Sequence, residues 1–268
     1  MNDICLMALL ASTGTWLVTA LGAGTVVFFK SPKERTMNFL LGFASGVMIA
    51  ASFWSLLAPA IERAREYSSV PAWAVAAGGF VTGALFLWGC DKGICTIRRS
   101  ITGKSEDYLK SGVNRVFMLV LSVTAHNIPE GLAVGVAFGA LQKGNFTPEA
   151  LMGAISLAVG IGLQNFPEGA AVSLPLRREG YSRKKSFFLG QASGIVEPAA
   201  ALVGVLAVTY IEAILPFALS FAAGTMITVA VHELIPECQR ECENCSYFST
   251  AGIIAGFAVM MILDVIPG

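Results

Sequence analysis

Charged residues are scarce in this sequence. Asp, Glu, Lys and Arg make up 13% of its 268 residues, about half of the roughly 25% that is typical of soluble domains. Apolar residues make up 55%, and the mean hydropathy is +0.68. This composition excludes a soluble globular protein. Lys and Arg number 18, as do Asp and Glu, so no net positive charge indicates a nucleic-acid partner. We expect residues 1–268 to form a single domain embedded in a lipid bilayer.

Basic residues are also missing from residues 1–5, which precede the first apolar run. Their absence is unlike a secretory signal peptide, so we expect this run to be retained as a span. Eight apolar runs follow one another, and each has at least the ~20 residues that a helix needs to cross a bilayer. They cover residues 4–29, 37–60, 71–90, 114–141, 148–175, 186–210, 213–236 and 247–267. The sequence thus predicts an all-α polytopic membrane protein with eight transmembrane helices.

The positions of Lys and Arg predict the orientation. Fifteen of the 18 follow the first, third, fifth and seventh runs, and only Arg63, Arg65 and Lys143 lie on the other side. By the positive-inside rule, both termini lie outside the cytoplasm. A polar cytoplasmic loop over about 92–113 separates three spans from the rest. We expect a 3+2+3 arrangement with inverted-repeat halves, as in many secondary transporters.

One polar motif occurs twice inside apolar runs. His126-Asn127-Ile128-Pro129-Glu130-Gly131 lies in the fourth run, and Gln164-Asn165-Phe166-Pro167-Glu168-Gly169 lies in the fifth. Spacings of three and four residues place the polar side chains of each copy on one helix face. Because the two runs are antiparallel, we expect the copies to meet near the bilayer midplane. Each proline also leaves the carbonyl four residues before it without a helical partner.

A third acid, Glu197, precedes Pro198 in the sixth run. No Lys or Arg lies beside these acids in their spans, so they need protons or a bound cation. One imidazole, three carboxylates and several amide oxygens suit Zn²⁺, Fe²⁺, Mn²⁺ or a related divalent ion, whereas the lack of thiolates here argues against Cu(I). The alternative is a polar network that only holds the helices together.

The paired motifs and the Glu197-Pro198 step resemble the ZIP (Zrt/Irt-like protein) family of divalent-metal transporters, in particular its bacterial GufA-type branch. The resemblance implies eight helices with extracytoplasmic ends and a metal site between the fourth and fifth. It implies transport of zinc, and also of iron, manganese or cadmium, into the cytoplasm. It further implies frequent homodimers and a place in the bacterial inner membrane. No resident cofactor is expected.

The resemblance also implies roles for individual residues. The first metal site corresponds to His126, Glu130, Gln164 and Glu168. A second, adjacent site corresponds to Asn127, Asn165 and Glu197, bridged by Glu130 and Glu168. Some relatives have Asp where Asn165 stands, so the second site here has one charge fewer. Met48 stands where some relatives have a thioether ligand, although packing is the usual role of such a Met.

Polar residues also lie at the predicted cytoplasmic ends of two spans. His232 and Glu233 close the seventh run and Asp91 closes the third, and together they form either an exit relay or capped helix ends with solvated acids. The zinc-protease pattern HExxH is excluded because position 236 is Pro. Cys238, Cys242 and Cys245, which we expect in the last cytoplasmic loop, are candidates for catching released metal.

Functions of other classes remain as alternatives. An intramembrane metal-dependent hydrolase would need an activated water at an open metal position, but the chain has only two His and no Ser/His pairing. A transporter of organic anions would need cationic groups or helix N-termini at the midplane. A metal-sensing or structural membrane protein would bind metal without flux.

Overall fold

Helices make up all the regular structure in the computed structural model within the residues it describes, 2–28, 34–67, 70–102, 112–141, 146–178, 180–210, 214–239 and 246–266. The α-helices are α1 (Asn2–Gly24), α2 (Glu34–Ala51), α3 (Ala58–Tyr67), α4 (Ala72–Thr102), α5 (Gly112–Gly139), α6 (Pro148–Arg178), α7 (Arg183–Ala192), α8 (Val196–Tyr210), α9 (Leu215–Val229), α10 (Ile235–Gln239) and α11 (Ser246–Val265). The 3-10 turn η1 (Thr25–Val27) extends α1. The π-helical segments η2 (Ser52–Leu57) and η5 (Ala230–Leu234) continue α2 and α9.

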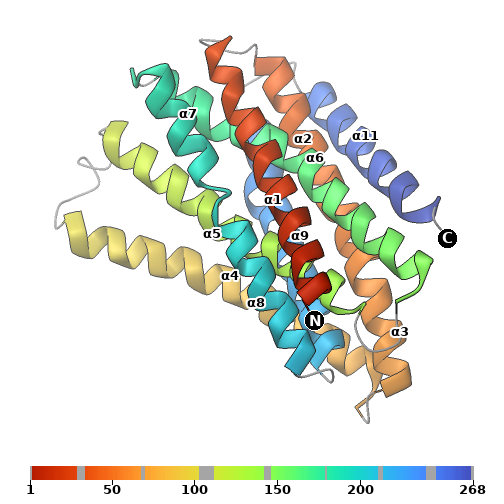
Figure 1. Ribbon diagram of the computed structural model, residues 1–268. Helices are drawn as coiled ribbons and strands as arrows, with labels where there is room; N and C mark the ends of the chain where they lie inside the picture. Colours follow the sequence, from red (N-terminus) through yellow and green to blue (C-terminus); the bar gives the residue numbers. More distant parts are fainter. Residues whose placement is uncertain are drawn as a thin grey trace.

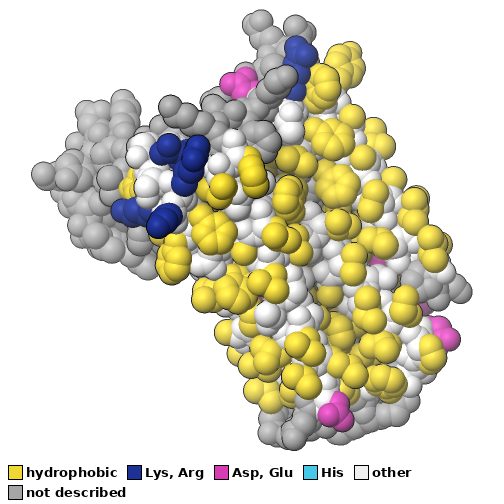
Figure 2. Space-filling view, turned by 45° about the horizontal axis from the view of Figure 1, so that its top comes forward, with side chains coloured by type: hydrophobic (Ala, Val, Ile, Leu, Met, Phe, Trp, Pro, Cys, Tyr) yellow, Lys and Arg dark blue, Asp and Glu magenta, His cyan; other side chains and the backbone are white. Residues whose placement is uncertain are grey.

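The helices form a bundle (Figure 1). Seven of the described helical segments are long and apolar enough to cross a bilayer, which confirms a polytopic all-α membrane protein. α5 has the position of the fourth predicted span, and part of its side chains lie outside the described portion of the chain. Figure 2 shows a broad hydrophobic face with Lys and Arg gathered toward one end. That end is the one expected at the cytoplasmic surface.

Four helix pairs carry the main packing: α2 with α11, α4 with α9, α5 with α8, and α1 with α6. These pairs show an internal symmetry. If the first span is taken as equivalent to the sixth, the second to the seventh, the third to the eighth and the fourth to the fifth, each of the four pairs corresponds to another of the four. Two inverted halves in a 3+2+3 order produce that relationship.

Glycines allow these pairs to approach closely. In each pair, both helices present glycines to the partner's backbone, at positions where a Cβ atom would overlap. These glycines are Gly42, Gly46, Gly252 and Gly256 for α2 and α11; Gly79, Gly83 and Gly224 for α4 and α9; Gly131, Gly135 and Gly204 for α5 and α8; and Gly22 and Gly169 for α1 and α6. Small residues are typical of helix contacts in membranes. Gly131 lies against the backbone of Glu197 and Gly169 against that of Thr19, so α8 and α1 pack directly beside the two motifs.

The second and seventh spans both contain a π-helical segment that leads into a proline. Pro59 follows η2 and Pro236 follows η5. Each proline deprives the carbonyl four residues earlier, of Ser55 or His232, of its helical partner. Wider π-type turns are one way in which membrane helices satisfy such freed groups. The shared defect supports the equivalence of these two spans.

Two stretches differ from the sequence prediction. The loop expected over 92–113 is wrong in its first part, because α4 continues to Thr102; residues 103–111 lie outside the described part. No proline occurs between Pro71 and Pro129, so no strong helix breaker ends α4 at the bilayer surface. The sixth span, expected as one helix over 186–210, is interrupted by a turn at 193–195 between α7 and α8. Pro198 lies in the first turn of α8, where its missing N–H costs no helical hydrogen bond.

Candidate metal-ion site

Six polar side chains of the predicted site are buried in the bundle, none of them more than 6% exposed. They are Asn127 and Glu130 of α5, Gln164, Asn165 and Glu168 of α6, and Glu197 of α8. α5 packs against both α6 and α8. The two motifs and the third acid therefore lie on neighbouring helices.

The first contact joins the two copies of the motif. Nε2 of Gln164 donates to Oε1 of Glu130 over 2.7 Å. Both side chains are fully buried, so this hydrogen bond forms away from water, where its electrostatic attraction is stronger than in solution. It fixes the position of one carboxylate between α5 and α6.

The second contact is a cluster around Glu197. Nδ2 of Asn165 lies 2.9 Å from Oε1 and 3.0 Å from Oε2 of Glu197. Thr15 of α1 donates its hydroxyl to Oε2, and Thr19 donates to Oε1 over 3.4 Å. Sequence reasoning did not identify the two threonines. Their spacing of four residues, which puts both on one face of an apolar helix, was the available signal.

The break in the sixth span explains where Glu197 lies. The turn at 193–195 ends α7 and starts α8, so Glu197 occupies the first turn of α8. A carboxylate at a helix N-terminus is stabilised by the unpaired N–H groups and the helix dipole. A Cβ atom added to Gly194 would lie 3.0 Å from the side-chain oxygens of Thr19 and Glu197. The lack of a side chain on Gly194 therefore leaves room for the carboxylate.

Several buried polar atoms of the cluster have no hydrogen-bond partner among the described residues. They are Nδ2 and Oδ1 of Asn127, Oε2 of Glu130, Oε1 of Gln164, Oδ1 of Asn165 and Oε1 of Glu168. Such atoms are costly to bury unless they bind something. Five of the six are oxygens, and carboxylate and amide oxygens are ligands for divalent cations. No Lys or Arg side chain of the described part is buried, so none of these side chains balances the acids.

The three acids interact with one another but do not converge on one point. Glu130 is close enough to Glu168 and Glu197 for their charges to interact. Yet the described His, Cys, Asp and Glu side chains include no group of three placed to hold one metal ion. In this conformation the amides of Gln164 and Asn165 present nitrogen to the carboxylates. An ion that bound their oxygens would require these amides to turn.

The remaining predicted residues are more dispersed. Met48 is buried in the apolar core. His232 is exposed on η5, while the charge of its neighbour Glu233 acts on Glu168. His126 and Asp91 lie on α5 and α4, but their side chains are outside the described part.

The predicted position of Cys238 in a loop is wrong. It is buried on α10, where its thiol donates to the carbonyl of Ile235 over 3.2 Å and its own carbonyl accepts from Ser249. This packing holds the end of the seventh span against α11. Cys242 and Cys245 lie outside the described residues.

Comparisons with known proteins agree with the site. The sequence profile of a family described as ZIP zinc transporter matches residues 97–264. Zinc transporter ZIP11 of Xenopus tropicalis is 40% identical, with 97% of each chain covered. Zinc transporter GufA of Myxococcus xanthus is 36% identical, covering 97% of this chain and 98% of its own. Zinc transporter ZIPB of Bordetella bronchiseptica is 36% identical, covering 97% and 81%. Both bacterial relatives support the GufA-type branch.

Proposed function

This chain belongs to the ZIP zinc-transporter family, and from that premise we propose that it carries zinc into the cytoplasm through the buried cluster between α5 and α6. Family membership makes this chain an integral membrane transport protein for divalent metal and not an enzyme. The alternative of an intramembrane hydrolase is therefore not supported. Iron, manganese and cadmium ions fit the same nitrogen and oxygen ligands and are proposed as secondary substrates.

The observation that carries the proposal is the group of three buried acids with no buried Lys or Arg beside them in the described chain. Glu130, Glu168 and Glu197 lie within spans and are 0 to 6% exposed. Ionisable groups at that depth are rare and mark ion pathways. The unpartnered oxygens of Asn127, Gln164 and Asn165 add neutral ligands. A divalent ion that passes through would supply both the missing charge and the missing partners.

We propose the following sequence of events. The ion enters from the extracytoplasmic side, loses most of its water, and is held by His126, Glu130, Gln164 and Glu168. The amide of Gln164, whose nitrogen donates to Glu130 in this structure, turns so that its oxygen faces the ion. A helix rearrangement then closes the outer path and opens the inner one, and protonation of a glutamate weakens the site and releases the ion. Asn127, Asn165 and Glu197 would hold a second ion beside the first.

The orientation follows from charge. Arg183, Lys184 and Lys185 lie exposed at the start of α7, at the end where basic residues gather (Figure 2), and we propose that this end faces the cytoplasm. Both termini would then lie outside, in the plasma membrane of a bacterium, as the bacterial relatives suggest. We also propose a homodimer. Met48, Asp91, His232 and Glu233 would line the path on either side of the central site.

Zinc flux into vesicles tests the proposal. The purified full-length protein is reconstituted into liposomes, and uptake of zinc, iron, manganese, cadmium and magnesium ions is recorded with and without a pH gradient. We expect zinc uptake to exceed magnesium uptake, because a site with nitrogen and amide ligands suits the softer ion. Glu130→Gln and His126→Ala should each lower zinc uptake by about tenfold or more.

The control is Glu149→Gln, which removes an exposed acid at the start of the same helix as Gln164. It should transport at the wild-type rate. Wild-type uptake by both Glu130→Gln and His126→Ala would reject the site. Zinc binding without uptake by the wild-type protein would instead indicate a sensor.

A further inference from the structure

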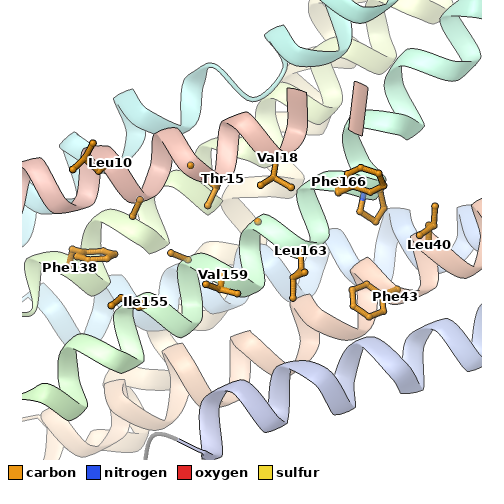
Figure 3. Close-up of a pocket in the computed structure, with 15 residues that line it drawn as sticks. Leu10, Thr15, Val18, Leu40, Phe43, Phe138, Ile155, Val159, Leu163 and Phe166 are labelled. Carbon is orange, nitrogen blue, oxygen red and sulfur yellow. The ribbon is translucent and has the colours of Figure 1, made fainter. Parts of the chain in front are cut away.

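A long apolar cavity opens beside the candidate site, with a volume of about 710 Å³. It lies between α1 and α2, over α6, and we call it the α1–α2 groove. Figure 3 shows Leu10, Thr15 and Val18 of α1 on one wall and Val159 of α6 on another. Phe43 of α2 lies toward one end. A volume of this size falls in the range of roughly 300–1,000 Å³ that is typical of ligand sites.

The chemistry of the walls selects an apolar occupant. All of the lining side chains are apolar except Thr15. The hydroxyl of Thr15 is already engaged, because it donates its one proton to Glu197 and also lies 2.9 Å from the carbonyl of Ser12. The groove therefore offers no free donor, and an apolar cavity does not hold ordered water. A hydrocarbon is the ligand that such walls can bind.

The rim of the groove lies at the depth of the lipid tails. Leu10 and Val159 are 63% and 45% exposed, on helices that cross the membrane. Their exposed faces continue the hydrophobic surface that surrounding lipid covers. The molecules present at that depth are phospholipid tails, so an acyl chain reaches the groove without leaving the hydrocarbon phase.

We propose that the α1–α2 groove binds one acyl chain of a membrane phospholipid against the turn of α1 that holds Glu197. The bound chain packs between α1 and α2 and supports α1 from its lipid side. Thr15 is the common member of the two sites, because it lines the groove, donates to Glu197, and accepts from Asn165 through its carbonyl over 3.3 Å. The binding site does not depend on which ion, if any, the acids carry.

Two glycines allow the groove to be filled by substitution. A Cβ atom on Gly14 would meet nothing within 4 Å, and one on Gly162 would meet only Val18, at 3.7 Å. Gly14→Leu and Gly162→Leu therefore place a side chain where the acyl chain would lie without a clash at Cβ. Gly153→Leu is the matched control. Gly153 lies on α6, also with nothing within 4 Å, but outside the groove.

Photolabelling tests the proposal. The full-length protein is reconstituted in phosphatidylcholine vesicles in which part of the lipid carries a diazirine near the middle of an acyl chain. After irradiation, labelled residues are mapped by peptide mass spectrometry. We expect labels at the groove to exceed those at the exposed Leu85 of α4, which reports ordinary lipid contact. Gly14→Leu and Gly162→Leu should lower the groove labels by about tenfold, and Gly153→Leu should leave them unchanged.

The wild-type map decides the matter even where a variant fails to fold. Labels spread evenly over α1, α4 and α11, without an excess at the groove, would overturn the proposal. So would groove labels that persist in both filled variants. Groove labels that disappear when the chain dimerises, as followed by size-exclusion chromatography, would show that this surface is a subunit interface and would equally overturn the proposal.

Discussion

The amide nitrogen of Gln164 lies 2.7 Å from Oε1 of Glu130, and the next residue, Asn165, makes the corresponding contact with Glu197. Two consecutive amides on α6 thus bind two acids that come from different helices, α5 and α8. In each case the N–H group stabilises the carboxylate and the amide oxygen is left without a described partner. We propose that the same four side chains bind a cation once the amides turn. The amides therefore offer the acids a neutral partner that competes with the ion.

This competition predicts the behaviour of Gln164→Met, which keeps a similar length but removes the amide. Glu130 would lose its hydrogen bond, and a neutral ligand would be lost as well. Zinc affinity should fall by about 10–100-fold, the cost that is typical when a group that orients a metal ligand is removed. Isothermal titration of the detergent-solubilised protein measures this. Gln191→Met is the control, since Gln191 bonds the carbonyl of Phe188, outside the acidic cluster. Unchanged affinity in Gln164→Met would mean that the first site does not use this side chain.

Thr15 should act as a positioning residue for Glu197. Thr15→Val removes the donated hydroxyl with little change in shape, and we expect zinc affinity and uptake to fall by about tenfold or more. Thr15→Ser keeps a hydroxyl and should restore both. Thr13 is half-buried on the same helix, and Thr13→Val should have no effect. In a double-mutant cycle with Glu197→Gln, the two changes should be non-additive by about 0.5–3 kcal/mol. Additive effects would show that Thr15 supports only the fold.

Close packing of α4 against α9 gives a prediction about stability. A Cβ atom on Gly83 would overlap the backbone of Phe221, whereas one on Gly78 would meet nothing within 4 Å. Gly83→Val should therefore cost about 1–3 kcal/mol and lower the Tm by roughly 2–4 °C for each kcal/mol. Gly78→Val, on the same helix, should leave the Tm nearly unchanged. The Tm of each variant is measured by thermal denaturation that is followed by size-exclusion chromatography. Equal losses in the two variants would contradict the observed helix contact.

The sequence was sufficient to predict the membrane class, the paired motifs and the third acid, because each depends on local composition or on helical spacing. Glu197 is one example, because an acid before a proline inside an apolar run can be recognised in the sequence without knowing which helices α8 contacts. The partners of Glu197 could not be predicted in the same way. A threonine in an apolar helix usually bonds a carbonyl of its own helix, and the hydroxyl of Thr15 does lie 2.9 Å from the carbonyl of Ser12. That Thr15 meets an acid 182 residues later depends on how α1 packs against α8.

The turn in the sixth span and the likeness of the second and seventh spans could not be predicted from the sequence either. Glycine is common in membrane helices, so Gly194 alone did not predict the turn at 193–195, which forms where Glu197 needs room. The similarity of the second and seventh spans also escaped sequence comparison. It is carried by the prolines Pro59 and Pro236 and the π-helical turns before them, a likeness of backbone geometry with few shared side chains.

Asn165→Asp tests whether the proposed second site binds an ion when a negative charge is added to it. In the metal-free protein, the new carboxylate would face Glu197 at the place where Asn165 now donates, and two like charges in a buried site repel. The Tm without metal should therefore fall. A divalent ion would bind the added charge, so zinc should raise the Tm of this variant by several degrees more than that of the wild type, at roughly 2–4 °C for each kcal/mol of added binding. Combining it with Glu197→Gln removes the repulsion and should restore the metal-free Tm. A variant that is destabilised without metal and gains nothing extra from zinc would show that Asn165 serves the structure and binds no ion.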